Sequence, residues 1–169
     1  LYANRVFQIE QPRVGLLSNG SEEGKGDQLV RDANAAFQEM DLNFVGNIEP
    51  IDLISGNVDI AVTDGYVGNI LMKTYEAAMK TVFRVMRDEL TSDLRAKLCA
   101  SLARPYLRNT VKKLDPTQFG GAPLLVINGI VIIAHGSSDA QIMRNAIYQA
   151  IRAHQSNIID VIKQGLSTS

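Results

Sequence analysis

The sequence predicts an α/β fold in which a mainly parallel sheet is flanked by helices, with a long helical segment inserted. Three apolar segments, at residues 14–18, 44–48 and 59–63, are each followed by a polar loop and then by a segment of helical periodicity. Strands that alternate with helices in this way form parallel sheets, because a parallel connection needs a long crossover.

The connecting helices follow from the spacing of apolar side chains. Residues 28–40 carry an apolar stripe at helical spacing, and residues 50–55 suit a short helix that Gly56 can end. After the third strand the pattern remains helical from about residue 69 to residue 115.

This long helical segment has an apolar stripe that extends well beyond a typical helix of about 11 residues. It predicts one long helix or a projecting helical hairpin on a core made of residues 1–68 and 116–169. Residues 91–93, Thr-Ser-Asp, suit a break because small oxygen-bearing side chains can cap a new helix, and Arg104-Pro105 suggests a further boundary or kink. The stripe consists of Leu71, Tyr75, Met79, Val82, Met86, Leu90, Leu94, Leu98 and Leu102.

The remaining residues return to strands and helices. Residues 123–127 and 131–134 suit two strands around an Asn-Gly turn, which is a common hairpin turn, although a wider connection is compatible with the pattern. Ser138 is expected to cap a helix that ends near Ile151, and a last helix covers about residues 156–164.

Composition narrows the functional classes. The chain has 169 residues, 46% hydrophobic and 21% charged, which suits one soluble domain and excludes disordered and fibrous classes. A net charge of −1 gives no field for gathering nucleic acid, and no apolar run approaches the roughly 18 residues of a membrane span. The single Cys99 favours a reducing cytosol without structural zinc and is expected to be a buried, inert thiol. The chain starts at Leu1 without a signal pattern, so we expect a piece of a longer polypeptide.

Positive charge is concentrated in the helical segment. Residues 80–115 hold nine lysines and arginines against four acidic side chains, whereas the rest of the chain is acidic. A basic amphipathic element suits an acidic protein partner or an anionic membrane surface. The simpler alternative is a solvated helical face with an apolar stripe that forms a dimer.

The loops after the strands contain the candidate functional residues. Residues 13–26 lead from an apolar strand into a glycine-rich loop whose amides can hold an anion, although such a loop also suits an ordinary tight turn. Ligands of open α/β sheets collect at the carboxyl ends of strands, so we expect these loops to form one polar pocket. The loops are residues 19–26, 64–69, 120–122 and 135–138, and their neighbourhood supplies Lys25, Asn69, Lys73, His135 and Ser137.

Two common phosphate motifs do not fit the glycine-rich loop. A P-loop has four residues between its glycines and then Lys-Ser/Thr, whereas three residues lie between Gly20 and Gly24, and Lys25-Gly26 follow. The dinucleotide fingerprint is missing as well, so neither a nucleoside triphosphatase nor nicotinamide binding is supported. We expect no cofactor and no metal.

Asp64 and His135 each have a structural and a functional interpretation. Asp64 lies between a strand and the long helix, where it can cap the helix or orient a lysine or histidine. His135 follows four aliphatic residues and is better placed for a site than His154, although a lone histidine is more often structural.

Five ordered blocks of sequence carry a family resemblance. They are Arg13-Val-Gly-Leu-Leu-Ser-Asn-Gly-Ser-Glu-Glu-Gly-Lys-Gly26, Phe44-Val-Gly-Asn-Ile-Glu49, Asp64-Gly-Tyr-Val-Gly-Asn69, Phe119-Gly-Gly-Ala-Pro-Leu-Leu125 and Asn128 through Ile133-Ala-His-Gly-Ser-Ser138. With these blocks the sequence resembles, over essentially its whole length, the PlsX-type phosphate acyltransferases, the acyl-carrier-protein:phosphate acyltransferases of bacterial phospholipid synthesis.

The resemblance implies conversion of a long-chain acyl-carrier protein and inorganic phosphate into acyl phosphate and free carrier protein. It also implies a fold like isocitrate and isopropylmalate dehydrogenases and phosphate acetyltransferases, a homodimer, and a cytoplasmic protein in peripheral contact with the anionic membrane. The family's N-terminal portion, with an Asp-Ala-Met-Gly-Gly-Asp-type motif, has no counterpart here. Because the family's cleft lies between two halves, this C-terminal portion can be inactive by itself.

The chemistry that the resemblance implies suggests roles for the candidate residues. Attack of phosphate on a thioester brings an anion toward a developing oxyanion, so the site needs amides, positive charge and exclusion of water. Two lysines would neutralise charge, a histidine would donate to the thioester oxygen or orient phosphate, and an asparagine with two glycine amides would complete an anion cradle. The catalytic candidates are Lys73, His135 and Asn69, and the candidates for substrate or phosphate binding are Gly20, Lys25, Asp64, Gly68 and Ser137.

The basic helical segment suits both docking of an acidic carrier protein and delivery of the acyl group to a membrane-bound enzyme. Leucines near its turn are expected to contact lipid or the second subunit, while neighbouring basic side chains reach anionic groups. These residues are Leu90, Leu94, Leu98, Arg95 and Lys97. Two alternatives remain open: a related enzyme such as a phosphate acetyltransferase that uses acyl-coenzyme A, and a noncatalytic scaffold that recruits carrier protein.

Overall fold

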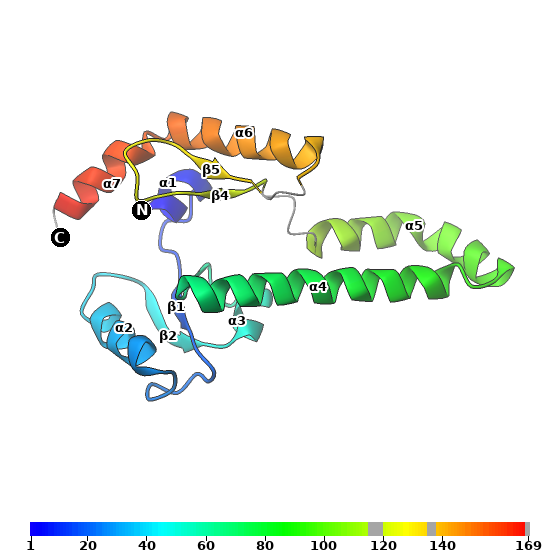
Figure 1. The fold of residues 1–169 in the computed structure, drawn as a ribbon, viewed down its shortest axis with the longest axis horizontal. Helices are drawn as coiled ribbons and strands as arrows, with labels where there is room; N and C mark the ends of the chain where they lie inside the picture. Colours follow the sequence, from blue (N-terminus) through cyan, green and yellow to red (C-terminus); the bar gives the residue numbers. More distant parts are fainter. Residues whose placement is uncertain (115–119, 135–137, 168–169) are drawn as a thin grey trace. The chain divides into compact units, whose positions relative to one another are not determined.

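The computed structural model describes residues 1–114, 120–134 and 138–167. The chain divides into two compact units, which we call the sheet unit and the helical unit. The sheet unit contains residues 1–71 and the end of the last helix from residue 161, and the helical unit contains residues 72–160 (Figure 1).

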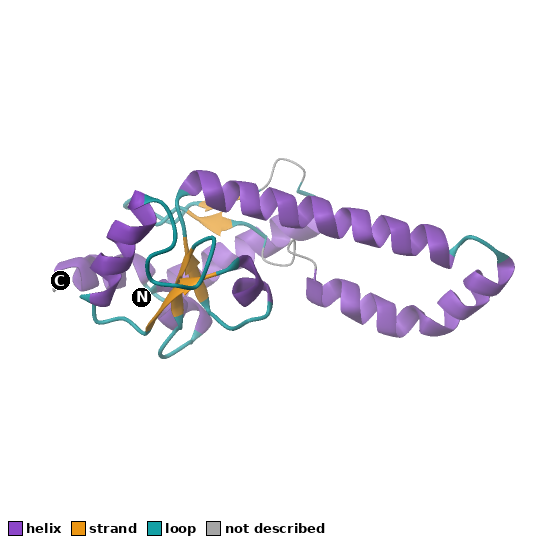
Figure 2. Cartoon of the chain, turned by 90° about the horizontal axis from the view of Figure 1, so that it is seen from below, coloured by secondary structure: helices purple, strands orange, loops and turns teal. Residues whose placement is uncertain are grey.

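The core of the sheet unit is a parallel sheet of β1 (Val14–Leu17), β2 (Phe44–Ile48) and β3 (Ile60–Val62) in the order β2-β1-β3. Figure 2 shows these strands in orange. Every residue of β1 is buried, as expected for a strand hydrogen-bonded on both edges and covered on both faces. The predicted α/β fold with a parallel sheet flanked by helices is thus confirmed.

Strand β2 contains one extra residue opposite β1. Val14 pairs with Phe44, but Leu16 pairs with Asn47 and Leu17 with Ile48, so the register shifts between the first two pairs. Gly46 lies in the shifted stretch with φ of +88°, a left-handed conformation that glycine adopts without the steric cost of a side chain. A bulge of this kind changes the direction of the side chains that follow it.

The crossovers of the sheet unit are α2 (Gln28–Gln38) and α3 (Pro50–Ile54), close to their predicted bounds. Helix α2 packs against β1 and β2, and Asp27 caps it by accepting a 2.9 Å hydrogen bond from the Val30 amide. The structure also contains α1 (Tyr2–Phe7), which was not predicted because six residues are too few to show a periodic pattern.

Two helices occupy the long segment that was predicted to be helical: α4 (Gly65–Leu90) and α5 (Leu94–Leu114). The break at residues 91–93 is confirmed, because Asp93 accepts a 2.7 Å hydrogen bond from the Ala96 amide at the start of α5. Of the boundary or kink expected at Arg104-Pro105, the boundary is wrong, since α5 continues through Pro105, and the kink remains a prediction. That the two helices project as a hairpin remains a prediction.

Much of the apolar stripe on α5 is exposed. Leu94, Leu98 and Leu102 are 85%, 66% and 74% exposed. Cys99 on the same helix is exposed too, so the expectation of a buried thiol is wrong. The described residues therefore do not bury this stripe, although its spacing is typical of a buried helix face.

The helical unit also contains β4 (Ala122–Pro123), β5 (Ile132–Ile133), α6 (Ala140–Gln155) and the start of α7 (Ile158–Ser167). The two strands pair antiparallel as predicted, but each is shorter than expected and the wider of the two possible connections joins them. Helix α6 is capped by Asp139, whose carboxylate accepts a 2.8 Å hydrogen bond from the Ile142 amide, rather than by Ser138 as predicted.

One ion pair ties the start of β1 to the segment that leads into β3. The Arg13 guanidinium donates from Nε and Nη2 to the two carboxylate oxygens of Asp59, at 2.9 Å each, and from Nη2 to the Gly56 carbonyl. The Arg13 amide donates to the same carboxylate at 2.8 Å. These hydrogen bonds lower the pKa of Asp59 to about 2, chiefly through the Arg13 side chain.

We expect Asp59→Asn to reduce the free energy of unfolding at neutral pH and to flatten its dependence on pH in acid. Because the pKa of Asp59 is about 2 in the folded chain and that of an unfolded aspartate is about 3.9, the ion pair stabilises the fold above about pH 4 and is lost as the pH falls toward 2. Urea unfolding at pH 7, 4 and 2.5 measures both effects. Asp41→Asn is the control, since Asp41 is exposed and forms no ion pair with a described residue. Equal losses of stability in the wild type and in Asp59→Asn between about pH 4 and 2 would contradict this expectation.

Candidate functional site

The carboxyl ends of the three parallel strands lie at one edge of the sheet. Leu17 pairs with Ile48, and Leu16 pairs with Val62, so the strands end almost level. Because β1 lies between the other two strands, the glycine-rich loop that follows it is next to both neighbouring strand ends. Of the loops predicted to share a pocket, residues 19–26 and the start of 64–69 therefore lie at the same edge.

The glycine-rich loop, which we define as residues 18–27, presents a row of free backbone amides. Its bonded amides are those of Ser18, which donates to Ile48 O at 2.9 Å, Lys25, which donates to Glu22 O at 3.0 Å, and Gly26, which donates to Asn19 Oδ1 at 3.1 Å. The N–H groups of residues 19–24 donate to no described residue. Consecutive free amides at a strand-to-helix connection can hold an anion.

Lys25 contributes a positive charge to this loop. A Cβ atom placed on the buried Gly20 would lie 3.0 Å from Lys25 Cγ, so the lysine stem passes directly over this glycine. Among the described residues Lys25 forms no ion pair, and the residue is exposed. Glu22 covers the same glycine with its carboxylate, 2.7 Å from the same Cβ position. This carboxylate lies close to the loop and would repel an anion bound there.

The start of α4 uses its own amides. Asp64 Oδ1 accepts hydrogen bonds from the amides of Tyr66 at 2.8 Å and Val67 at 3.0 Å, so the capping interpretation of Asp64 is confirmed. Its carboxylate occupies the helix end where an anion would otherwise bind. The Gly68 amide donates to Asp64 O at 3.0 Å, so its predicted part in an anion cradle is wrong. Gly68 instead allows close packing, because a Cβ there would lie 2.7 Å from Thr63 Cγ2.

Asn69 and Lys73 lie one turn apart on α4, so they share a face of the helix as predicted. Both are exposed, and the side chain of neither forms a hydrogen bond or ion pair with a described residue. Their catalytic roles remain predictions. His135 and Ser137 lie outside the described residues.

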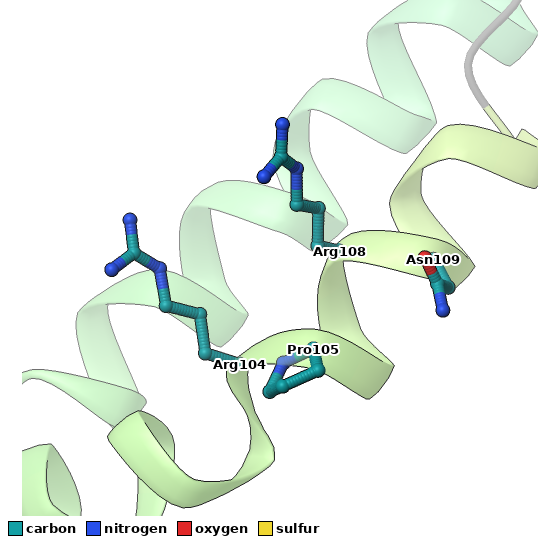
Figure 3. Close-up of a pocket in the computed structure, with 4 residues that line it drawn as sticks. All are labelled: Arg104, Pro105, Arg108 and Asn109. Atoms are coloured by element: carbon teal, nitrogen blue, oxygen red, sulfur yellow. The ribbon is translucent and has the colours of Figure 1, made fainter.

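Among the residues predicted to contact a membrane or a second subunit, Leu90 is half-buried at the end of α4, and the others lie exposed on α5. Arg95 and Lys97 form no ion pair with a described residue. Further along α5, Arg104, Pro105, Arg108 and Asn109 line an open depression of about 590 Å³ (Figure 3). Figure 3 shows the two arginine side chains projecting in the same direction from successive turns. In its described residues, α5 therefore exposes both basic and apolar side chains.

The sequence analysis missed two buried polar residues beside the glycine-rich loop. Asn34 on α2 is 3% exposed and Asn47 on β2 is 6% exposed. Asn47 donates from Nδ2 to the loop carbonyls of Glu22 at 2.9 Å and Lys25 at 3.4 Å, and Asn34 Nδ2 donates to Asn47 Oδ1 at 2.9 Å. In the sequence, Asn47 could have been noticed as a polar residue next to the end of an otherwise apolar strand.

Metal clusters and membrane-spanning helices are both absent from the part of the chain that the structure describes. In residues 1–114, 120–134 and 138–167, no cluster of three or more His, Cys, Asp or Glu side chains is arranged to hold a metal ion. Within those same ranges, every helix is too short or too polar to cross a bilayer.

Comparison with known proteins gives a consistent family. The family model described as "Fatty acid synthesis protein" matches residues 1–161. The chain is 47% identical over 166 residues to a phosphate acyltransferase of Brevibacillus brevis, which covers 98% of this chain and 50% of that protein. It is 43% identical over 166 residues to a phosphate acyltransferase of Clostridium acetobutylicum, again covering 98% and 50%, and 44% identical over 168 residues to one of Pelotomaculum thermopropionicum, covering 99% and 49%.

The chain spans about half the length of these curated relatives. The match to the family model extends over nearly all of its residues and includes the glycine-rich loop, the bulged strand β2 and the start of α4. The chain therefore belongs to the fatty acid synthesis protein family, and its resemblance to PlsX-type phosphate acyltransferases is confirmed.

Proposed function

We propose that the full-length protein transfers a long-chain acyl group from acyl-carrier protein to inorganic phosphate, and that phosphate binds in the glycine-rich loop. The observation that carries the proposal is the row of free amides at residues 19–24, next to a lysine without an ion-pair partner among the described residues, at the carboxyl edge of a parallel sheet. The relatives named phosphate acyltransferase support the reaction class.

The proposed reaction is a direct displacement at the thioester. A phosphate oxygen attacks the carbonyl carbon, the carbonyl oxygen becomes an oxyanion, the carbon–sulfur bond then breaks, and the leaving thiolate takes up a proton. The loop amides and Lys25 hold the phosphate, so that two anionic groups can approach each other at low electrostatic cost. Lys73, Asn69 and His135 keep the catalytic roles that were expected from the sequence.

The proposed partners fit the exposed surface of α5. Carrier proteins are acidic, and the described part of α5 presents basic side chains without an acidic residue among them. The exposed leucines at the start of α5, with Arg95 and Lys97 beside them, suit peripheral contact with an anionic bilayer or an apolar contact within a homodimer. These partners belong to the full-length protein.

We expect the full-length protein to form acyl phosphate when it is incubated with a long-chain acyl-carrier protein and inorganic phosphate. Mass spectrometry of the products, with [18O]phosphate as the tracer, measures this directly. Parallel reactions with acyl-coenzyme A test the related acetyltransferase-like activity. If acyl phosphate forms from acyl-coenzyme A and not from acyl-carrier protein, then acyl-coenzyme A is the donor. Tight binding of carrier protein without any product would favour the noncatalytic scaffold.

Replacement of Lys25 by methionine should raise the KM for phosphate by roughly tenfold or more, because a hydrogen bond to a charged group contributes about 1.5–3 kcal/mol. The KM for the acyl donor should change little, since the proposed contact is with phosphate. Steady-state kinetics at varied phosphate concentration measures the effect. Lys163→Met is the control, because Lys163 is an exposed lysine on α7 with no assigned role. An unchanged KM for phosphate in Lys25→Met would remove this lysine from the phosphate site.

Reversing two charges on α5, with Arg95→Glu and Lys97→Glu together, should weaken binding to anionic vesicles at least about tenfold, since each basic residue near such a surface contributes about 1 kcal/mol. Sedimentation with phosphatidylglycerol vesicles measures binding, and vesicles of neutral phosphatidylcholine provide the baseline. Arg5→Glu with Lys163→Glu is the matched control outside α5. If the doubly reversed α5 variant sediments as strongly as the wild type, membrane contact does not involve these residues.

A further inference from the structure

The two buried asparagines connect three elements around the glycine-rich loop. Asn47 comes from β2, Asn34 comes from α2, and the carbonyls that Asn47 binds belong to residues 22 and 25 of the loop. Among the described residues, these asparagines are the buried polar side chains. Burial of an amide is costly unless it is hydrogen-bonded, so this pair has a defined hydrogen-bonding pattern.

The chemistry of the partners fixes the orientation of both amides. The loop carbonyls can only accept hydrogen bonds, so Asn47 must direct its NH2 group toward them and its oxygen toward Asn34. Asn34 then donates to Asn47 Oδ1 and accepts a 2.9 Å hydrogen bond from Gln38 Nε2. Gln38 also donates to the Glu23 carboxylate at 2.8 Å, so the series of hydrogen bonds returns to the loop.

The residues that Asn47 binds are the two ends of a tight turn. The Lys25 amide donates to Glu22 O at 3.0 Å, and Asn47 donates to that same oxygen at 2.9 Å. The contact of Asn47 with Lys25 O holds the other end of the turn. The turn that carries the stem of Lys25 is thus tied to β2 by a buried side chain.

The bulge in β2 explains how Asn47 comes to face the loop. Successive side chains of a regular strand alternate between its two faces, but the extra residue in β2 interrupts that alternation just before Asn47. No atom lies within 4 Å of a Cβ placed on Gly46, so this glycine is needed for its positive φ and not to make space. The bulge in β2 thus turns Asn47 toward the loop carbonyls that its amide group binds.

We propose that Asn47 is a positioning residue for the phosphate loop: its amide, oriented by Asn34, fixes the 22–25 turn and thereby the amides and lysine that bind phosphate. This inference rests on the proposed function for its kinetic consequence. Asn47 does not touch the substrate, and it acts through the loop. A purely structural role would change the amount of folded protein without changing the affinity for phosphate.

The test uses the full-length protein with Asn47→Asp, a change of similar size whose carboxylate cannot donate to the two carbonyls when ionised. We expect the KM for phosphate to rise about tenfold, as for the loss of an ordinary hydrogen bond or two, with the KM for the acyl donor within about twofold of the wild type. Val58→Ala is the control, because Val58 is buried in the sheet unit and lies before β3, at the amino-terminal end of that strand. It should lower stability without changing the KM for phosphate.

A second variant and a second readout cover poor folding and lack of activity. Asn34 bonds to no loop residue itself, so a rise of about threefold in the KM for phosphate in Asn34→Ala must be transmitted through Asn47 or through Gln38 and Glu23. Hydrogen exchange of the peptide spanning residues 19–27 should become faster in both asparagine variants and not in Val58→Ala. Unchanged exchange in that peptide, or equal kinetic effects of Asn47→Asp and Val58→Ala, would overturn the proposal. If the wild type forms no acyl phosphate, the proposed function fails, and the exchange comparison still decides whether Asn47 fixes the loop.

Discussion

The arrangement of the candidate site depends on the hydrogen bonding of β1 between two parallel neighbours. This pairing buries the whole of β1 and brings three strand ends level at one edge of the sheet. Loops that are distant in sequence therefore start from adjacent points, and the central strand delivers the glycine-rich loop to the middle of that edge. The free amides and Lys25 would have no common location without this register.

The glycine-rich loop combines fixed and unsatisfied groups. The carbonyls of Glu22 and Lys25 are held by Asn47, and the amides of Lys25 and Gly26 are bonded within the loop, whereas the amides of residues 19–24 donate to no described residue. Groups that are already oriented lose little entropy when an anion binds, and this is the advantage of a preorganised site. The Glu22 carboxylate near Gly20 adds an anionic group that opposes the binding of phosphate.

The repeating features of the fold could be predicted from the sequence, and the single contacts could not. Apolar runs and helical spacing identified the three parallel strands and the crossover helices, because burial repeats with a fixed period. Residue types that cap helices identified the break at residues 91–93. The glycines at 20 and 68 look alike in sequence, yet only the structure shows that the amide of Gly68 is used inside α4. The role of Asn47 depends on a bulge in β2 and on a partner thirteen residues away, which no periodic pattern reports.

The most direct test of this account is a phosphate titration of the full-length protein labelled with [15N]glycine, followed by NMR. Inorganic phosphate is added at constant ionic strength, with chloride as the control anion. The account predicts saturable shifts of the Gly20 and Gly24 amide signals at phosphate concentrations near the KM, and no such shifts with chloride. Unchanged Gly20 and Gly24 signals under conditions in which the protein turns over would contradict the claim that phosphate binds in the glycine-rich loop.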